Sequence, residues 1–162
     1  MSIFSSINIS SSALTAERTR MDVISKNLAN ANTTRTQSGD PYRRQVVVFK
    51  EAEEKQSFKS ILESKKSKDV DKGVEIVGIV EDKTPFRQVY NPGHPDADEK
   101  GYVTMSNVDT ITEMVDMISA TRSYEANVTA LNTSKSMLLK ALEIGKQGSV
   151  INGYKSWRTI VY

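Results

Sequence analysis

One short stretch of the sequence, "HPDADEKG" at residues 94–101, gathers side chains that could perform chemistry. Its candidate metal or acid-base groups are His94, Asp96, Asp98 and Glu99. The two aspartates and Gly101 match the first, third and sixth positions of a calcium-binding loop, but Lys100 and Asn107 stand where that loop needs further acidic ligands. His94 is the only histidine and has no paired base nearby. We therefore interpret this stretch as a polar turn without a metal or catalytic role.

The composition disfavours most other kinds of active site. The chain has no cysteine, which excludes disulfides, thiolate metal sites and cysteine nucleophiles, and a single histidine excludes a zinc site built on a histidine pair. The segment "GVEIVG" at 73–78 lacks the Lys-Ser/Thr ending of a phosphate-binding loop. Basic and acidic residues number 22 and 20, and we interpret Arg43 and Arg44 as solvated or paired. The sequence predicts no enzyme, no cofactor and no nucleic-acid partner.

No segment of the sequence looks able to cross a membrane or to direct secretion by cleavage. The longest aliphatic and aromatic block is "VVVF" at 46–49, far shorter than a bilayer requires. The first twenty residues have neither a basic leading region nor a continuous apolar stretch. We expect no transmembrane segment, and export, if it occurs, must use a route without a cleaved signal.

An apolar seam predicts a helix near the N-terminus. Its heptad positions are Ile7, Leu14, Met21 and Leu28, with Ile3, Ile24 and Ala31 interleaved. Such a seam is typical of a helix that packs against another helix. Ser10 and Glu17 narrow the seam, so the helix needs a partner. After Leu28 the Asn- and Thr-rich segment up to Thr36 competes for backbone hydrogen bonds and should end the helix.

A second, stronger seam predicts a long C-terminal helix. Its positions are Met117, Tyr124, Leu131 and Leu138, with Thr121, Val128, Lys135 and Leu142 interleaved. Asn107 or Asp109 can cap its start, and Gly145 is the expected stop. After Gly145 the heptad rhythm is lost, so residues 147–162 form an atypical tail that is either a separate docking segment or an appendage.

The two predicted helices differ in length, which leaves apolar surface without a partner. At about 1.5 Å per residue, residues 7–28 span about 33 Å and residues 110–144 about 52 Å. A chain that returns between them pairs them most simply as antiparallel helices. The seams alone fit a monomeric hairpin and an intermolecular bundle equally well, but Ile111, Val115 and Ile118 add an adjoining apolar face that favours the bundle.

The central segment predicts a small antiparallel sheet, and the whole chain therefore an α+β fold. Strand-like runs occupy 42–49, 73–80 and 86–90, bounded by Gly, Pro and Asp, and 91–101 reads as a loop leading to the long helix. We expect a coiled-coil-like helical domain from 1–36 plus 107–146. We expect a β domain at 37–106 with a charged, flexible insertion at 50–72.

Several long motifs resemble the flagellar rod and hook family of axial proteins. They are "ISSSALTAERTRMDVISKNLANANTTRT" at 9–36, "GDPYRRQVVVF" at 39–49, "YNPGHPDADEKGYV" at 90–103, and the helix at 107–146. Together they resemble the proximal-rod members. The resemblance implies a structural subunit exported by the flagellar type III system and polymerised outside the inner membrane, in the basal body. It implies as partners copies of this chain, other rod proteins, the export apparatus, and a ring or export-gate adaptor at the rod base.

The resemblance also implies that the helix seams form the interfaces of this chain. The predicted interface residues are Ile7, Leu14, Met21, Ile24, Leu28, Met117, Tyr124, Val128, Leu131, Leu138 and Leu142. We further expect Asn27, Asn30 and Asn32 to satisfy backbone groups where the chain leaves the helix and between subunits. Two rival hypotheses remain open. An export chaperone or coiled-coil adaptor predicts ordered helices in a small oligomer, and a metal hydrolase at His94 predicts bound divalent metal.

Overall fold

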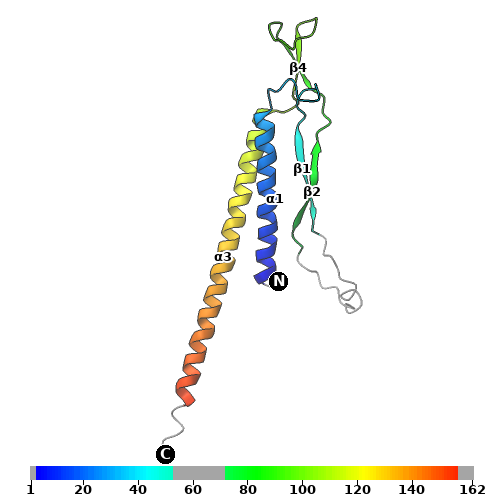
Figure 1. Ribbon diagram of the computed structural model, residues 1–162. Helices are drawn as coiled ribbons and strands as arrows, with labels where there is room; N and C mark the ends of the chain where they lie inside the picture. The colour runs from blue at the N-terminus through cyan, green and yellow to red at the C-terminus, as the bar shows by residue number, and fades with distance from the viewer. Residues whose placement is uncertain (1–2, 53–71, 157–162) are drawn as a thin grey trace, which may run out of the picture.

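The computed structural model describes residues 3–52 and 72–156, with the backbone alone from residue 146 onward. Two long helices lie side by side, one β ribbon runs along the first helix, and a second ribbon lies beyond the helix ends (Figure 1). The elements are α1 Ile3–Ala29, β1 Gln45–Glu51, β2 Val74–Glu81, β3 Arg87–Tyr90, β4 Tyr102–Met105 and α3 Thr110–Ser156. This architecture confirms the predicted α+β class with terminal helices around antiparallel strands.

Helix α1 ends where the amide-rich segment begins, as predicted. The Asn30 side-chain amide donates to the carbonyl of Lys26 at 2.9 Å, and the Asn30 backbone carbonyl accepts from the amide of Thr33 at 3.0 Å. These local bonds replace the next helical turn. The helix begins at Ile3, earlier than the seam from residue 7 indicated.

Helix α3 begins at the predicted place but does not end there. Asp109 caps it, accepting from the Ile111 backbone amide at 3.2 Å and from the Thr112 hydroxyl at 2.7 Å. The prediction that Gly145 stops the helix is wrong, because α3 continues to Ser156. A glycine within a helix costs about 1 kcal/mol, but it ends a helix only when it turns left-handed. In the described residues only Gly39 and Gly101 have positive φ. Residues 147–156 thus continue α3, and 157–162 lie outside the description.

Helices α1 and α3 run antiparallel. Asn27 contacts Glu113 at 3.0 Å, and Arg20 contacts Asp116 at 3.4 Å, so residue numbers fall along α1 as they rise along α3. The 27 residues of α1 span about 40 Å and the 47 residues of α3 about 70 Å at the usual helical rise. Figure 1 shows α3 passing well beyond the start of α1. The antiparallel direction is confirmed, and the packing suggests a coiled-coil-like pair.

The strands correct the prediction of one sheet. They form two separate antiparallel ribbons, β1–β2 and β3–β4. The loop predicted at 91–101 is the turn of the second ribbon, and sequence inspection missed β4. This turn is closed by Asp98, whose carboxylate accepts from the backbone amides of Lys100 at 2.9 Å and Tyr102 at 2.8 Å. Gly101 has φ +80°, and a Cβ there would stand 2.9 Å from the Tyr90 ring.

The core follows α1, which lies between α3 on one side and β1 on the other. Its buried apolar residues along the helices and β1 are Ala16, Val23, Ile24, Val47 and Ala120. A smaller buried cluster, Ala31, Tyr42 and Val108, closes the region where the chain leaves α1. Strand β1 extends to Glu51, so the predicted insertion at 50–72 begins within a strand, and its residues 53–71 lie outside the description.

Candidate functional site

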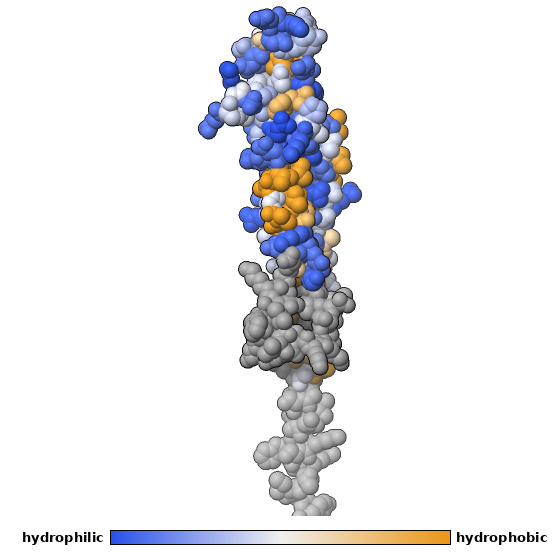
Figure 2. Space-filling view, turned by 90° about the vertical axis from the view of Figure 1, so that its right-hand side faces the viewer, coloured by the Kyte–Doolittle hydropathy of each residue, from blue (hydrophilic) through white to orange (hydrophobic). Residues whose placement is uncertain are grey.

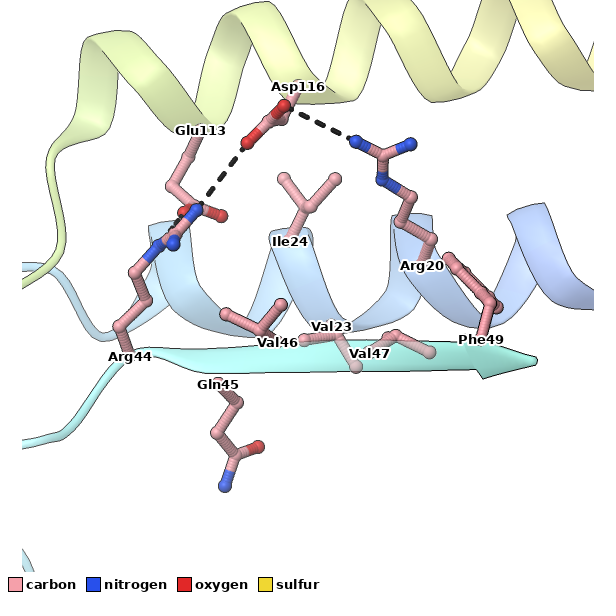
Figure 3. A pocket seen from close by; sticks show the side chains of 10 residues that line it. All are labelled: Arg20, Val23, Ile24, Arg44, Gln45, Val46, Val47, Phe49, Glu113 and Asp116. Atoms are coloured by element: carbon pink, nitrogen blue, oxygen red, sulfur yellow. Dashed lines mark hydrogen bonds and ion pairs between the residues drawn. The ribbon is translucent and has the colours of Figure 1, made fainter. Parts of the chain in front are cut away.

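A buried polar junction joins α1, β1 and α3 at the end of the molecule where the helices meet the strands. Its centre is Glu113, which is 0% exposed. One carboxylate oxygen accepts from Arg44 Nε at 2.6 Å, and the other accepts from Asn27 Nδ2 at 3.0 Å. Figure 3 shows Arg44, the residue just before β1, reaching to Glu113 on α3. The buried charge is thereby paired and hydrogen-bonded, as a stable interior carboxylate must be.

Asn27 uses its complete hydrogen-bonding capacity in this junction. Its amide nitrogen donates to the Gln45 carbonyl at 2.8 Å and to Glu113. Its amide oxygen accepts from the Tyr42 hydroxyl and from the Gln45 backbone amide, both at 3.0 Å. Two donors and two acceptor sites are all that an asparagine side chain offers. The end of α1 is therefore tied to both β1 and α3 by one side chain.

The charged side chains around Arg44 form a continuous chain of ion pairs. Its guanidinium contacts Asp82 at 3.4 Å and Asp116 at 3.5 Å, and Asp116 also contacts Arg20 at 3.4 Å. Burial lowers the pKa of Arg44, but its hydrogen bond to Glu113 and the attraction of that carboxylate outweigh burial and raise it. Burial, together with the negative charge of Glu113, raises the pKa of Tyr42. Both shifts hold these groups protonated, so Arg44 stays cationic and the Tyr42 hydroxyl stays a donor.

A second set of bonds fixes the loop after β2 to the start of α3. The Asn107 amide donates to the Thr84 hydroxyl at 2.8 Å and its oxygen accepts from the Arg44 backbone amide at 2.7 Å. Arg43 donates to the carbonyls of Asp82 and Thr84, and its guanidinium lies 4.3 Å from the centre of the Phe86 ring. Asn107, the alternative cap, therefore joins the loop instead, and both arginines are paired.

The acidic stretch at 94–99 makes local turn contacts. His94 Nδ1 accepts from the Asp96 backbone amide at 3.1 Å, and the Asp96 carboxylate contacts Thr34 at 2.9 Å and Arg35 at 3.7 Å. Within 3–52 and 72–156, no three His, Cys, Asp or Glu side chains are grouped so that they could hold a metal ion. In the same ranges no helix is both long and apolar enough to span a membrane.

The predicted interface residues fall into three groups. Ile24 and Asn27 are buried. The half-buried ones are Ile7, Leu14, Met21, Leu28, Asn30, Met117, Tyr124, Val128, Leu131 and Leu138. Asn32 and Leu142 are exposed. Of the three asparagines, therefore, only Asn27 enters the junction.

Sequence inspection missed Glu113, Arg44 and Tyr42 as a group. Glu113 lies one turn before Met117, on the same stripe that faces α1. An acid in line with a buried apolar stripe is a signal that a cationic or amide partner must meet it there.

Helix α3 also exposes an apolar row on the side opposite α1. We call Ile111, Met114, Val115 and Ile118 the outer row; they are 71%, 53%, 61% and 55% exposed. Spacings of three and four residues place them on one side of the helix, away from the buried Glu113 and Ala120. Further along, the exposed apolar residues of α3 are Met137, Leu139, Leu142 and Ile144.

Two further features shape the surface near β1. A groove of about 280 Å³ lies between α3 and β1 with α1 as its floor (Figure 3). It is lined by Arg20, Val23, Ile24, Arg44, Gln45, Val46, Val47, Phe49, Glu113 and Asp116. The side of the molecule that carries the β1–β2 ribbon shows a hydrophobic patch (Figure 2). Exposed apolar residues of this ribbon are Val48, Val74, Val77, Ile79 and Val80.

Comparison with known proteins identifies the family of this chain. The family model "Flagella basal body rod protein" matches residues 7–36, and "Flagellar basal body rod FlgEFG protein C-terminal" matches 99–144. The flagellar basal-body rod protein FlgC of Bacillus subtilis (strain 168) is 53% identical, covering 90% of this chain and 100% of the relative. FlgC of Borreliella burgdorferi is 47% identical, with 89% and 98% covered. FlgC of Escherichia coli O157:H7 is 42% identical, with 90% and 100% covered. The chain belongs to the FlgC family of flagellar basal-body rod proteins.

Proposed function

We propose that this chain polymerises in the rod by packing its terminal helices against those of neighbouring subunits. As a FlgC family member it is a structural protein of the flagellar basal-body rod. The observation that carries the proposal is that α3 has apolar side chains on opposite sides, and α1 covers only one of them. Exposed apolar rows of this extent are typical of interaction surfaces.

We propose the same division into a helical part and a β part that the sequence predicted. Residues 1–36 and 107–146 form the helical inner part of the rod, and 37–106 form the outer β part. The side-by-side helices and the separate ribbons support this division. The tail at 147–162 extends the helical part as far as residue 156.

The partners we propose are other rod proteins and further copies of this chain. A ring component or export-gate adaptor would meet it at the rod base, and the flagellar type III apparatus would export it. The function is structural, without catalysis, cofactor or nucleic acid. The pairing of Arg43 and Arg44 inside the fold supports the last point, since these arginines are engaged within the chain.

The interface residues divide by their exposure. We propose that the half-buried seam residues, such as Leu14 and Leu131, pack mainly within the α1–α3 pair. Leu142 is 59% exposed, so it would contact a neighbouring subunit. Asn32, also exposed, would do the same at the other end of the helix pair.

A charge placed in the outer row tests the proposal. Val115→Asp with Ile118→Asp should leave the helicity of the purified chain unchanged, because both side chains are exposed in it. In cells whose own gene is deleted, the variant should be exported but absent from isolated basal bodies, and swimming should be lost. The matched control, Val77→Asp with Ile79→Asp on the β1–β2 ribbon, carries the same charge on another exposed apolar surface.

The other possible results distinguish assembly through α3 from the adaptor or chaperone hypothesis. Normal basal bodies with the outer-row variant would overturn assembly through α3. Wild-type chain found in a small oligomer with a partner, and absent from basal bodies, would support the adaptor or chaperone instead. Amide hydrogen exchange on the free chain adds a second test, since fast exchange in 1–36 and 107–146 would show helices that become stable only on assembly.

A further inference from the structure

Gly145 lies inside α3 although nothing in the described part of the chain requires a glycine there. Glycine is an unfavourable residue within a helix. The positive φ that reserves a position for glycine occurs, in the described residues, only at Gly39 and Gly101. A Cβ built at Gly145 would meet nothing within 4 Å. The missing side chain therefore leaves room on the surface of α3 that is open to another molecule.

Gly145 continues the side of α3 that packs against α1. Met21 contacts Thr121, and α1 begins 18 residues before Met21, so the antiparallel α1 reaches only to roughly residue 139 of α3. Leu142 and Gly145 follow the seam residue Leu138 by four and seven residues, which places all three on one side of the helix. Leu138 is half-buried, whereas Leu142 is 59% exposed. The α1-facing side of α3 thus continues past α1 without cover from the described residues.

The outer row near the start of α3 has the same spacing as the residues that continue past α1. We call Leu138, Ala141, Leu142 and Gly145 the overhang. An offset of 27 residues matches Ile111 with Leu138, Met114 with Ala141, Val115 with Leu142, and Ile118 with Gly145. Because the intervals of three and four residues are identical, two α3 helices that run parallel can keep both sets in contact over about two turns.

The matched side chains also complement one another in size. Met114 and Ile118 are large and stand opposite the small Ala141 and Gly145. Facing surfaces interdigitate best when large residues on one side meet small residues on the other. Met114 is 53% and Ile118 55% exposed, so both are open to contact in the single chain. A side chain at position 145 would fill the space that Ile118 needs.

We propose that Gly145 receives Ile118 of a second copy of this chain, in a parallel contact between the overhang of one α3 and the outer row of the next. This contact rests on the proposed polymerisation and names the partner of the outer row. The two copies are displaced along α3 by 27 residues, which is about 40 Å. Because two different surfaces meet, the contact is heterologous and repeats from copy to copy instead of closing as a dimer.

A side chain added at position 145 tests the fit. Gly145→Leu should keep or raise the helicity of the purified chain, because leucine favours helices and the space around the position is open. In cells whose own gene is deleted, it should lower the yield of basal bodies about tenfold, since overpacking displaces Ile118. Gly145→Leu combined with Ile118→Ala should recover most of the yield.

Ser136→Leu is the matched control for this series. Ser136 is exposed and precedes Gly145 by nine residues, which places it on the opposite side of α3. This variant should assemble like wild type. A normal yield of basal bodies with Gly145→Leu, or a low yield that Ile118→Ala does not raise, would overturn the proposed contact.

Cysteine cross-linking tests whether the partner is a second copy, since the native chain has no cysteine. Val115→Cys and Leu142→Cys introduce one of the matched pairs. Basal bodies from cells carrying only the double variant should give, after oxidation, disulfide-linked species of two or more copies, and each single variant should give none. Basal bodies that contain the double variant without such species would overturn the contact while leaving the proposed function intact. Wild-type chain absent from basal bodies would instead overturn the proposed function.

Discussion

The two ends of α3 differ in how fully the chain itself satisfies them. At the N-terminal end, Glu113 is completely buried and both its oxygens accept hydrogen bonds from residues far away in the sequence. Toward the other end, Leu139, Leu142 and Ile144 are at least half exposed, and α3 passes beyond α1. The polar groups at the first end are satisfied within one chain. The apolar side chains at the second end stay exposed, and we expect neighbouring subunits to cover them.

This difference shows two kinds of specificity in one helix. Hydrogen bonds are directional, so the junction of Asn27, Arg44 and Glu113 fixes the register of α1, β1 and α3. Apolar contacts are not directional and tolerate different partners of suitable shape. In the assembly that we propose, the first property serves the fold of the subunit, and the second would serve its contacts with neighbouring subunits.

The largest effect on stability should come from breaking the junction at its centre. Glu113→Ala leaves Arg44 and the Asn27 amide without their main acceptor, and removing one partner of a buried pair costs about 3 kcal/mol. Urea unfolding of the purified chain followed by circular dichroism measures this loss. A free energy of unfolding within about 0.5 kcal/mol of wild type would show that the junction does not stabilise the fold.

A series of asparagine variants should separate the junction from its surroundings. Asn27→Leu leaves the backbone of Gln45 and the Tyr42 hydroxyl unpaired, which should cost about 2 kcal/mol. Asn32→Leu, at an exposed position, should change stability by less than about 0.5 kcal/mol. The same unfolding measurement compares them, and equal effects would refute a special role of Asn27.

At the other end, strengthening α3 should have a smaller and opposite effect. Gly145→Ala removes a helix-disfavouring residue, and a Cβ there meets nothing within 4 Å. The gain should be about 1 kcal/mol of local helix stability, visible as slower amide exchange around residue 145. Unchanged exchange would contradict a continuous α3 at this glycine.

The junction should also respond to acid through Asp82. Its hydrogen bond from the Thr84 backbone amide, with help from Arg44, holds the pKa of Asp82 below its ordinary value of 3.8. A carboxyl group with a lowered pKa in the folded state stabilises the fold above that ordinary value, and the contribution disappears as the pH falls through the folded pKa. Asp82→Asn should therefore be less stable than wild type at neutral pH, and the difference should shrink steadily below pH 3.8. A difference independent of pH would argue against ionisation as its cause.

The smallest effect on stability should come from the uncovered end. Leu142→Ser with Ile144→Ser changes side chains that are already exposed, so the unfolding free energy should stay within about 0.5 kcal/mol of wild type. Assembly should nevertheless weaken, measured as fewer basal bodies per cell in the deletion strain. Normal assembly would show that this end needs no apolar neighbour.

Much of the fold could be predicted because its signals are local. The seams through Leu14 and Leu131 identified two helices, and β-branched runs identified β1 and β2. The four-residue strand β4 and the division into two ribbons were missed, because a short strand is defined by its pairing with β3 rather than by its own residues. The end of α3 was also misjudged, since Gly145 favours but does not force a stop.

By itself, the sequence determined the two apolar seams, the end of α1 at its amide-rich segment, and the absence of cysteine, because these depend on residue identity and near-neighbour spacing. Only the tertiary structure decided which polar residues act together. Asn27, Arg44 and Glu113 are 17 and 69 residues apart in sequence and meet because α1, β1 and α3 converge at one point. The same packing decided which side of α3 is covered, since a helix with two apolar sides does not specify which one faces its own partner.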